Sequence, residues 1–162
     1  MTAGLWSVTA LGAHHDRSRF GCGSEVLDRY LREQVTQDIR RRVAGCFVML
    51  DGNVVAGYYT LSAVSVALAD LPHDVARRLP RYPAVPAVRM GRLAVDLQYR
   101  GEGYGAALLV NALQRAAGSE IPAVALAVDA KDDQVAAFYR HFGFMQLAND
   151  PLAFFLPLAT VK

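Results

Sequence analysis

The sequence predicts an α/β (α+β) domain in which a mixed, twisted β-sheet carries helices on both faces. Two observations predict this class. The first half of the chain is typical of an antiparallel meander, and in the second half strands alternate with amphipathic helices. The 162 residues, 53% of them hydrophobic, suffice for one domain over residues 1–162 with a single sizeable core.

Composition excludes several classes of protein. A chain this apolar, with a net charge of only +2, has enough surface to bury and is not disordered. Its longest apolar stretch, residues 121–128, contains Pro122 and falls far below the roughly 18 residues of a spanning helix. Residues 1–16 contain no basic segment followed by an apolar one, so no secretory signal is expected. We therefore expect a cytoplasmic protein that makes no membrane contact.

The cysteines and histidines give no sign of a metal site. Cys22 and Cys46 form no ligand cluster, and we expect them to be buried structural thiols. The adjacent run His14-His15-Asp16 imitates a metal site, but three successive residues cannot all face one ion. The sequence thus predicts no metal.

The first elements are a strand and a helical segment. Residues 6–11 are a candidate strand. Ser24 is a candidate N-cap for a helix, or a pair of helices, that runs to about Arg42, because apolar residues follow it at helical spacing. Gly45 is expected to end this helix.

A hairpin follows. Residues 46–50 are typical of a buried strand, Asp51-Gly52-Asn53 is a strong turn signal, and residues 54–66 return as a long second arm. Residues 69–86 carry four prolines and are expected to form a loop around one short helix, residues 73–79.

The next strand is predicted at residues 88–95, and a glycine-rich turn over residues 98–105 leads into an amphipathic helix that ends near Gly118. The apolar face of this helix comprises Leu108, Leu109, Ala112, Leu113 and Ala116.

The last elements are a buried strand at residues 124–128, a helix at residues 132–142 and a closing hairpin. Gly143 is the expected C′ residue of that helix. Its sheet-facing residues are expected to be Val135, Phe138 and Phe142. The hairpin joins residues 144–147 and 152–156 through Asn149-Asp150-Pro151.

The glycine-rich turn is the first chemical signal. Alternate glycines let several N–H groups converge on one ligand, and the helix that follows adds the positive end of its dipole, so the turn suits a pyrophosphate. It is not a P-loop, because Ala106 and Ala107 stand where Lys and Ser or Thr are required. A dinucleotide fingerprint is also disfavoured, because Glu120 lies near the wrong end of the following strand. A plain tight turn remains the alternative.

Several motifs together resemble one family. Gln98-x-x-Gly101-x-Gly103 is similar to the acyl-CoA signature of the GNAT superfamily of N-acetyltransferases, and residues 137–144 resemble its closing helix and turn. The resemblance narrows to the TacT-like acetyltransferase toxins of bacterial type II toxin–antitoxin modules. It does so through Phe20-x-Cys22-Gly23, Gly57-Tyr58-Tyr59-x-Leu61-Ser62, residues 91–96 and Phe155-Leu156-Pro157-Leu158.

The resemblance implies how acetyl-CoA is held. Backbone groups of residues 93–95 would pair with the pantetheine arm, and N–H groups of residues 100–106 would hold the pyrophosphate. The implied cofactor-binding residues are Leu93, Ala94, Val95, Gln98, Arg100, Gly101, Glu102, Gly103, Tyr104, Gly105, Ala106 and Asp132. Tyr104 replaces a more usual small aliphatic residue, and the carboxylate of Glu102 is expected to point to water. Asp132 and Asp133 also suit a helix N-terminus.

Tyr139 is the implied catalytic residue, the general acid that protonates the departing CoA thiolate. Taken without the resemblance, a tyrosine on an amphipathic helix is more often a core residue. No carboxylate pair has the spacing of a dedicated base. That absence suits an α-amino group, whose pKa near 8 leaves far more of it neutral at pH 7 than the lysine value near 10.4 does.

The resemblance further implies that the acceptor is the α-amino group of aminoacyl-tRNA, whose acetylation blocks translation. The arginines then become candidate tRNA contacts, although a solvated helix end and a loop would explain them equally. The candidates are Arg40, Arg41, Arg77, Arg78, Arg89 and Arg92.

The implied partners are a ribbon-helix-helix antitoxin, operator DNA reached through that antitoxin, and a second copy of the chain in a homodimer. Two alternatives stay open at this point. One is acetylation of a small amine, a peptide or an antibiotic, and the other is a non-catalytic corepressor or binding module.

Overall fold

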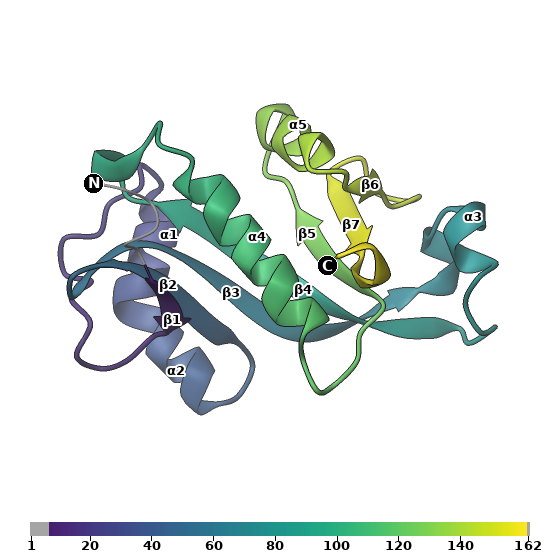
Figure 1. The fold of residues 1–162 in the computed structure, drawn as a ribbon, viewed down its shortest axis with the longest axis horizontal. Coiled ribbons are helices and arrows are strands. Elements are labelled where there is room, and N and C mark those ends of the chain that lie inside the picture. The colour runs from purple at the N-terminus through teal and green to yellow at the C-terminus, as the bar shows by residue number, and fades with distance from the viewer. Residues whose placement is uncertain (1–6, 162) are drawn as a thin grey trace. The chain divides into compact units, whose positions relative to one another are not determined.

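The computed structural model describes residues 7–161. The strands are hydrogen-bonded in one seven-stranded sheet in the order β1-β2-β3-β4-β5-β7-β6 (Figure 1). The chain divides into two compact units, one of Met1–Ser62 with Met90–Ala112 and one of Ala63–Arg89 with Leu113–Lys162. The mixed sheet with helices confirms the predicted fold class.

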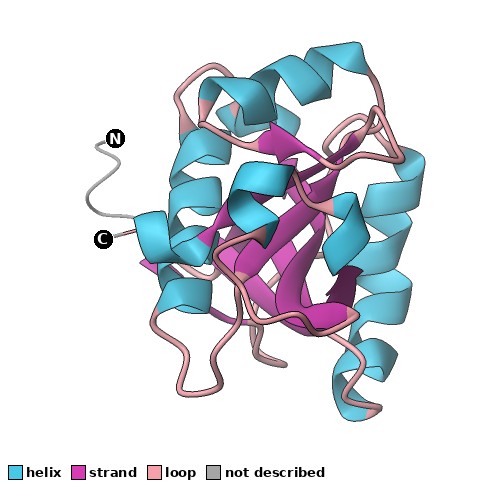
Figure 2. Cartoon of the chain, turned by 90° about the vertical axis from the view of Figure 1, so that its right-hand side faces the viewer, coloured by secondary structure: helices cyan, strands magenta, loops and turns pink. Residues whose placement is uncertain are grey.

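The elements are distinguished by colour in Figure 2. The strands are β1 (Ser7–Ala10), β2 (Gly45–Asp51), β3 (Val54–Ala67), β4 (Ala84–Val95), β5 (Ala125–Asp129), β6 (Met145–Gln146) and β7 (Ala153–Pro157). The α-helices are α1 (Glu25–Arg29), α2 (Val35–Arg40), α3 (His73–Ala76), α4 (Tyr104–Ala117) and α5 (Asp133–His141). A π-helical turn spans Tyr30–Gln34, and 3₁₀ turns span Leu68–Asp70, Leu97–Tyr99 and Leu158–Thr160.

In the first unit, β1, β2 and β3 form the predicted antiparallel meander. The β2–β3 hairpin turns at Gly52, whose φ of 63° lies in the left-handed region that glycine enters at little cost. Asp51 pairs with Val54 across the turn. The turn signal in the sequence is therefore confirmed.

The helical segment after Ser24 begins as predicted and ends differently. The Ser24 side chain accepts a hydrogen bond from the Leu27 N–H and caps α1. The π-helical turn between α1 and α2 was not predicted. The end of α2 is made by Arg42, which adopts a φ of 62°, whereas Gly45 already belongs to β2. The expectation that Gly45 ends the helix was wrong, because an arginine takes the left-handed position there.

Strand β3 shows that helices cover both faces of the sheet in the first unit. A Cβ on Gly57 would lie 2.8 Å from the Leu108 side chain of α4 and 3.1 Å from the Ala94 carbonyl oxygen, so glycine at this position lets that helix approach the strand closely. The next side chain points to the other face, where the Tyr58 hydroxyl donates to the Leu27 carbonyl at 2.7 Å. Tyr59 returns to the α4 side and donates to the Asn111 side chain. Alternate residues of one strand thus anchor helices on opposite faces.

In the second unit, β4 begins earlier than predicted. The sequence placed residues 69–86 in a loop, but the strand starts at Ala84 and contains Pro86. The Pro86 carbonyl accepts a hydrogen bond from the Val124 N–H, so this proline contributes the one backbone group that it still has. Helix α3 is also shorter than the predicted residues 73–79.

Helix α5 and the closing hairpin complete the second unit. Strand β7 pairs antiparallel with β6, which confirms the predicted closing hairpin, and it also pairs antiparallel with β5. The fully buried residues of α5 are Ala136 and Tyr139. The predicted residues Val135, Phe138 and Phe142 are only half-buried. The buried residues Ala136 and Tyr139 each lie one position after a predicted one, so the buried face of the helix is rotated by one residue from the prediction.

Two further expectations concern the cysteines and the membrane. Cys22 and Cys46 are both buried free thiols, as predicted. Within residues 7–161, no helix has the length and apolar character needed to span a bilayer.

Candidate active site

The glycine-rich turn of the first unit is anchored by a buried carboxylate. Asp96, which is 8% exposed, follows β4 directly. Its two oxygens accept hydrogen bonds from the Gln98 N–H at 2.9 Å and from the Gly21 N–H at 3.0 Å. Tyr99 adds a second tie, because its hydroxyl donates to Asp51 at 2.9 Å. The residues before the turn are thereby fixed to the hairpin and to the loop ahead of α1.

The turn itself leaves open space above its backbone. Gly101 and Gly103 adopt φ values of 79° and 82°, and a Cβ added to either would meet no atom within 4 Å. Glycines with positive φ values are typical of turns whose N–H groups converge to bind an anion. The described residues therefore fit a phosphate-bearing ligand at this position.

The N-terminus of α4 continues the same surface. The Ala107 N–H donates to the Gly103 carbonyl at 3.0 Å and begins the helical hydrogen bonding. The N–H groups of Gly103, Gly105 and Ala106 precede that bond, in the positions that a helix leaves for a ligand. A helix of this length adds a positive partial charge at the same end.

Arg100, Glu102 and Tyr104 have distinct roles around the turn. The Arg100 guanidinium donates to the Cys22 carbonyl at 2.6 Å, and its backbone N–H donates to the Leu97 carbonyl at 3.4 Å, so both groups are engaged within the unit. Glu102 is exposed, as expected. Tyr104 is buried, and its pKa is raised, first by that burial and then by the carboxylate of Glu102.

Tyr139 lies on α5 in the second unit, and its side chain is only 5% exposed. Its ring packs edge-on against Phe138 and lies 5.4 Å from the Phe144 ring. Burial and, after it, the negative charge of Asp129 together raise the pKa of Tyr139 to about 12. Among residues 7–161, no group forms a hydrogen bond with its hydroxyl. The phenol is thus protonated at neutral pH, and its hydroxyl is not used within the described residues.

The position of Tyr139 is set by two helix caps. The Asp132 carboxylate accepts a hydrogen bond from the Val135 N–H at 2.9 Å, which confirms its expected role at the N-terminus of α5. Gly143, with a φ of 92°, ends the helix, and the Phe144 N–H donates to the Tyr139 carbonyl at 3.2 Å. Asp132 was also a candidate cofactor contact, and this cap accounts for one of its oxygens.

Asp129 is a functional candidate that the sequence did not reveal. It is the last residue of β5 and forms an ion pair with Arg89 of β4. About half of each side chain is exposed. Arg89 was a candidate tRNA contact, and the structure gives its guanidinium a carboxylate partner within the unit. No spacing in the sequence links two residues that are 40 positions apart.

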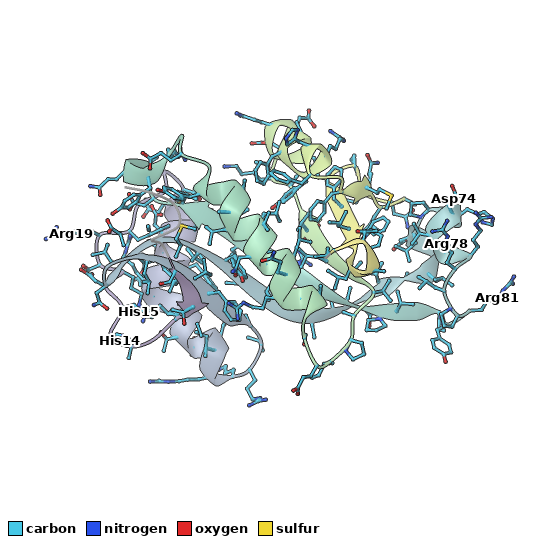
Figure 3. The ribbon with its side chains drawn as sticks, in the orientation of Figure 1. His14, His15, Arg19, Asp74, Arg78 and Arg81 are labelled. Atoms are coloured by element: carbon cyan, nitrogen blue, oxygen red, sulfur yellow. The ribbon has the colours of Figure 1, made fainter. Side chains whose placement is uncertain are left out.

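The other arginines separate into exposed and packed groups. Arg40 and Arg41 are exposed at the end of α2, and Arg77 and Arg78 are exposed at the end of α3. Figure 3 shows Arg78 and Arg81 at the same end of the α3 segment. Arg92 differs, because its guanidinium lies 3.5 Å above the Tyr30 ring and is half-buried. Packing of the first unit explains Arg92 without any tRNA.

The structure therefore distributes the predicted residues over both units. Residues 93–106, with Arg40, Arg41 and Arg92, belong to the first unit. Asp132 and Tyr139, with Arg77, Arg78 and Arg89, belong to the second. Across residues 7–161, no group of three or more His, Cys, Asp or Glu side chains has a metal-binding arrangement.

Comparison with known sequences identifies a family and named relatives. The model of the acetyltransferase (GNAT) family matches residues 10–144. A probable toxin TacT from Sinorhizobium fredii (strain NBRC 101917 / NGR234) is 33% identical over 159 residues, covering 91% of this chain and 88% of the relative. A tRNA-acetylating toxin from Mycobacterium tuberculosis (strain ATCC 25618 / H37Rv) is 38% identical over 139 residues, covering 85% of this chain and 82% of the relative.

Solved structures agree with this finding. AtaT complexed with acetyl-methionyl-tRNAfMet superimposes with a TM-score of 0.90 at 27% identity, covering 96% of both chains. The AtaT Y144F mutant toxin bound to the C-terminus of the antitoxin AtaR superimposes with a TM-score of 0.80 at 25% identity, covering 96% of this chain and 94% of that one.

Proposed function

The chain belongs to the GNAT acetyltransferase family, and we propose on that basis that it is a toxin that acetylates the α-amino group of aminoacyl-tRNA. Membership makes it an acetyl-CoA-dependent N-acetyltransferase. The acceptor class is supported by the tRNA-acetylating relative and by AtaT, which was solved with an acetylated methionyl-tRNA. The single observation in this chain that carries the proposal is Tyr139, a buried phenol whose hydroxyl has no partner among residues 7–161.

The glycine-rich turn is proposed to hold the pyrophosphate of acetyl-CoA. The open space above Gly101 and Gly103 and the N–H groups at the start of α4 support this role. Backbone groups of Leu93, Ala94 and Val95 are proposed to pair with the pantetheine arm. Gln98 and Arg100 act mainly by shaping the turn, because the Gln98 N–H and the Arg100 side chain are bonded within the first unit.

Tyr139 is proposed to be the general acid. The acceptor amine forms a bond to the thioester carbonyl carbon, the carbon–sulfur bond breaks, and the departing thiolate takes a proton. A phenol with a pKa of about 12 is fully protonated at neutral pH, so the donor is in its acid form at every turnover. After the attack the nitrogen carries an extra proton, which it loses to solvent, and solvent returns a proton to the phenolate.

The exposed arginines are proposed to contact tRNA phosphates. Arg40 and Arg41 at the end of α2, and Arg77 and Arg78 at the end of α3, present guanidinium groups to solvent. Arg89 and Arg92 are weaker members of this set, because each already has a partner within its unit.

An antitoxin is proposed to neutralise the protein and, with it, to repress their own operon. The toxin AtaT bound to the C-terminus of its antitoxin supports this assignment. We further propose that the antitoxin is of the ribbon-helix-helix class, that operator DNA is bound only through it, and that the toxin is a homodimer in the cytoplasm. A small-amine or peptide acetyltransferase and a non-catalytic corepressor are the alternatives.

The decisive experiment is mass spectrometry of aminoacyl-tRNA after incubation with acetyl-CoA and the protein, under single-turnover conditions. We expect one acetyl group on the α-amine, and a rate reduced roughly 10²- to 10⁴-fold in Tyr139→Phe. The affinity for acetyl-CoA should not change, because the proposed pyrophosphate site is formed by the glycine-rich turn and not by Tyr139. Tyr82→Phe, which removes the same hydroxyl from a side chain that is 62% exposed, is the matched control.

Expression of the wild type should arrest growth, and expression of Tyr139→Phe should not. Acetylation of a free amine or peptide in place of aminoacyl-tRNA would favour the small-amine alternative. Repression of the operon with no acetylation by the wild type would favour the corepressor. A Tyr139→Phe rate within about threefold of wild type would remove Tyr139 from the mechanism.

A further inference from the structure

The second unit contains a cleft that none of the proposed roles uses. Its volume is about 170 Å³. Most of its walls are apolar side chains and backbone of β3, β5 and Leu147, while three charged side chains reach it. Its lining includes Val64, Val66, Asp70, Arg89, Asp129 and Leu147.

Each of the two carboxylates in this cleft is held by a partner through one oxygen, and that of Asp129 forms an ion pair. The Asp70 side chain accepts a hydrogen bond from the Asn149 amide. The Asp129 side chain is held by Arg89, and the guanidinium contacts its Oδ2 atom. Throughout residues 7–161, no donor contacts the Oδ1 atom of Asp129, and its side chain is 48% exposed. Asp129 is therefore both oriented and accessible.

The cleft also lies near the proposed general acid. Asp129 ends β5, and the chain passes from it through Asp132, the N-cap, into α5, which carries Tyr139 (Figure 1). The charge of Asp129 is close enough to the Tyr139 phenol to add to the effect of burial on its pKa. A group bound at Oδ1 of Asp129 would thus lie in the neighbourhood of the acid.

We propose that this cleft is the subsite for the acceptor amine, in which Oδ1 of Asp129 receives the α-ammonium group and Arg89 holds the carboxylate in position. The inference rests on the proposed function, which requires an acceptor with a primary α-amine. Near pH 7 an α-amine with a pKa near 8 is largely an ammonium group, which a carboxylate binds through charge-assisted hydrogen bonds. The walls formed by Val64, Val66 and Leu147 carry no charge, and of the two carboxylates in the cleft Asp129 is the one whose charge acts on Tyr139.

The arrangement has a consequence for the order of events. Before the acceptor binds, burial and, after it, the negative charge of Asp129 keep the pKa of Tyr139 raised. An ammonium group on Asp129 offsets that charge, so the phenol becomes a stronger acid when the acceptor is in place. The ammonium group loses its proton to solvent, and the neutral amine attacks the thioester. The new carbon–nitrogen bond returns a positive charge to the nitrogen, which offsets Asp129 while the thiolate takes its proton from Tyr139, and the nitrogen then loses its extra proton to solvent. Arg89 and Asp129 are positioning residues in this scheme, and Tyr139 alone transfers a proton to the leaving group.

The test compares two small ligands that differ only in the amine. One is 3′-amino-3′-deoxyadenosine with an alanyl group joined to its 3′-amino group by an amide bond. The other carries a propionyl group in place of the alanyl group. At pH 6.5 we expect wild type to bind the alanyl compound at least roughly 10-fold more tightly, the scale of one charge-assisted hydrogen bond. Asp129→Asn should abolish this preference while its affinity for the propionyl compound stays within about twofold, on that same scale.

Asp133→Asn is the matched control, because it removes an exposed carboxylate from the first turn of α5 in the same unit and should keep the preference. Asp129→Glu retains the charge and should keep part of the preference for the alanyl compound. This variant tests the subsite if Asp129→Asn folds poorly. Equal binding of the two ligands by wild type, or an unchanged preference in Asp129→Asn, overturns the subsite. Acetylation of aminoacyl-tRNA by wild type is measured alongside. Its absence rejects the proposed function, whereas its presence with an unchanged preference rejects the subsite alone.

Discussion

At the scale of single residues, Tyr139 carries a hydroxyl group that the packing of its ring does not require. A buried hydroxyl without a partner costs about 1–3 kcal/mol. Phenylalanine would fill the same space between Phe138 and Phe144 without that cost. The hydroxyl is thus better explained by a ligand than by the core.

The first prediction compares two buried tyrosines. Tyr139→Phe should leave the free energy of unfolding unchanged or raise it by up to about 1 kcal/mol, because an unpaired hydroxyl is removed. Tyr58→Phe should lower it by about 0.5–1.5 kcal/mol, because the Tyr58 hydroxyl donates to the Leu27 carbonyl at 2.7 Å. Urea denaturation of both variants checks this. A clear loss of stability in Tyr139→Phe would show that its hydroxyl has a structural partner.

The second prediction concerns the ionisation of Tyr139. Its pKa is raised from 10.0 to about 12, so the phenol stays protonated where an ordinary tyrosine has ionised. Its contribution to stability is complete below pH 10 and is lost as the pH rises towards 12, because the unfolded chain releases this proton first. The ultraviolet difference between wild type and Tyr139→Phe should contain no phenolate band up to about pH 10.5. A band with a midpoint at or below pH 10 would contradict the buried phenol.

At the scale of elements, the turn between β4 and α4 begins with residues held by hydrogen bonds and continues with glycines that have open space around them. Asp96 and Tyr99 hold its start, and Gly101 and Gly103 leave its rim open. A side chain on Gly103 would meet no atom within 4 Å, so its effect would come from backbone strain and from charge rather than from a steric clash.

The third prediction separates these two effects. Gly103→Ala and Gly103→Asp impose the same left-handed strain, of about 1–2 kcal/mol, on a residue with a φ of 82°. Only the aspartate adds a negative charge beside the proposed pyrophosphate site. Gly103→Asp should therefore weaken acetyl-CoA binding at least roughly 10-fold more than Gly103→Ala does, a change that titration calorimetry resolves. Equal affinities of the two variants would place the pyrophosphate elsewhere.

At the scale of the whole molecule, the net charge of +2 is too small to attract RNA by itself, so the distribution of arginines matters more. The α3 segment concentrates exposed guanidinium groups at one end, where Figure 3 shows Arg78 and Arg81. Such a patch acts through phosphate contacts that are independent of sequence.

The fourth prediction tests that patch. The double variant Arg77→Ala/Arg78→Ala should weaken binding to all tRNAs, and the slope of log affinity against log salt should fall by about 1 for each lost phosphate contact. Arg29→Ala is the control, because the Arg29 guanidinium is paired with Glu25 and Glu33 on its own helical segment. Filter binding at several salt concentrations measures both. An unchanged slope in the double variant would exclude this patch from the tRNA surface.

The sequence alone determined the features that depend on near neighbours in the chain. The N-cap at Ser24, the turn at Gly52, the buried face of α4 and the glycine-rich turn all follow from local conformational preferences and from apolar spacing. The resemblance of its motifs also identified the family and led to the proposal that Tyr139 is the general acid. Local rules failed where another residue could take a special conformation, as Arg42 does in place of Gly45.

Only the tertiary structure decided which distant side chains meet. Asp129 and Arg89 are 40 positions apart, and Asp96 and Gly21 are 75 positions apart, so neither pair leaves a periodic trace in the sequence. Arg92 was a candidate tRNA contact from the sequence, but the fold places its guanidinium over the Tyr30 ring. The physical reason is that strand pairing and helix packing set these contacts, and both depend on the whole arrangement of backbone rather than on any local spacing. The sequence therefore determined the chemistry that the chain carries, and the fold determined which charged groups stand beside it.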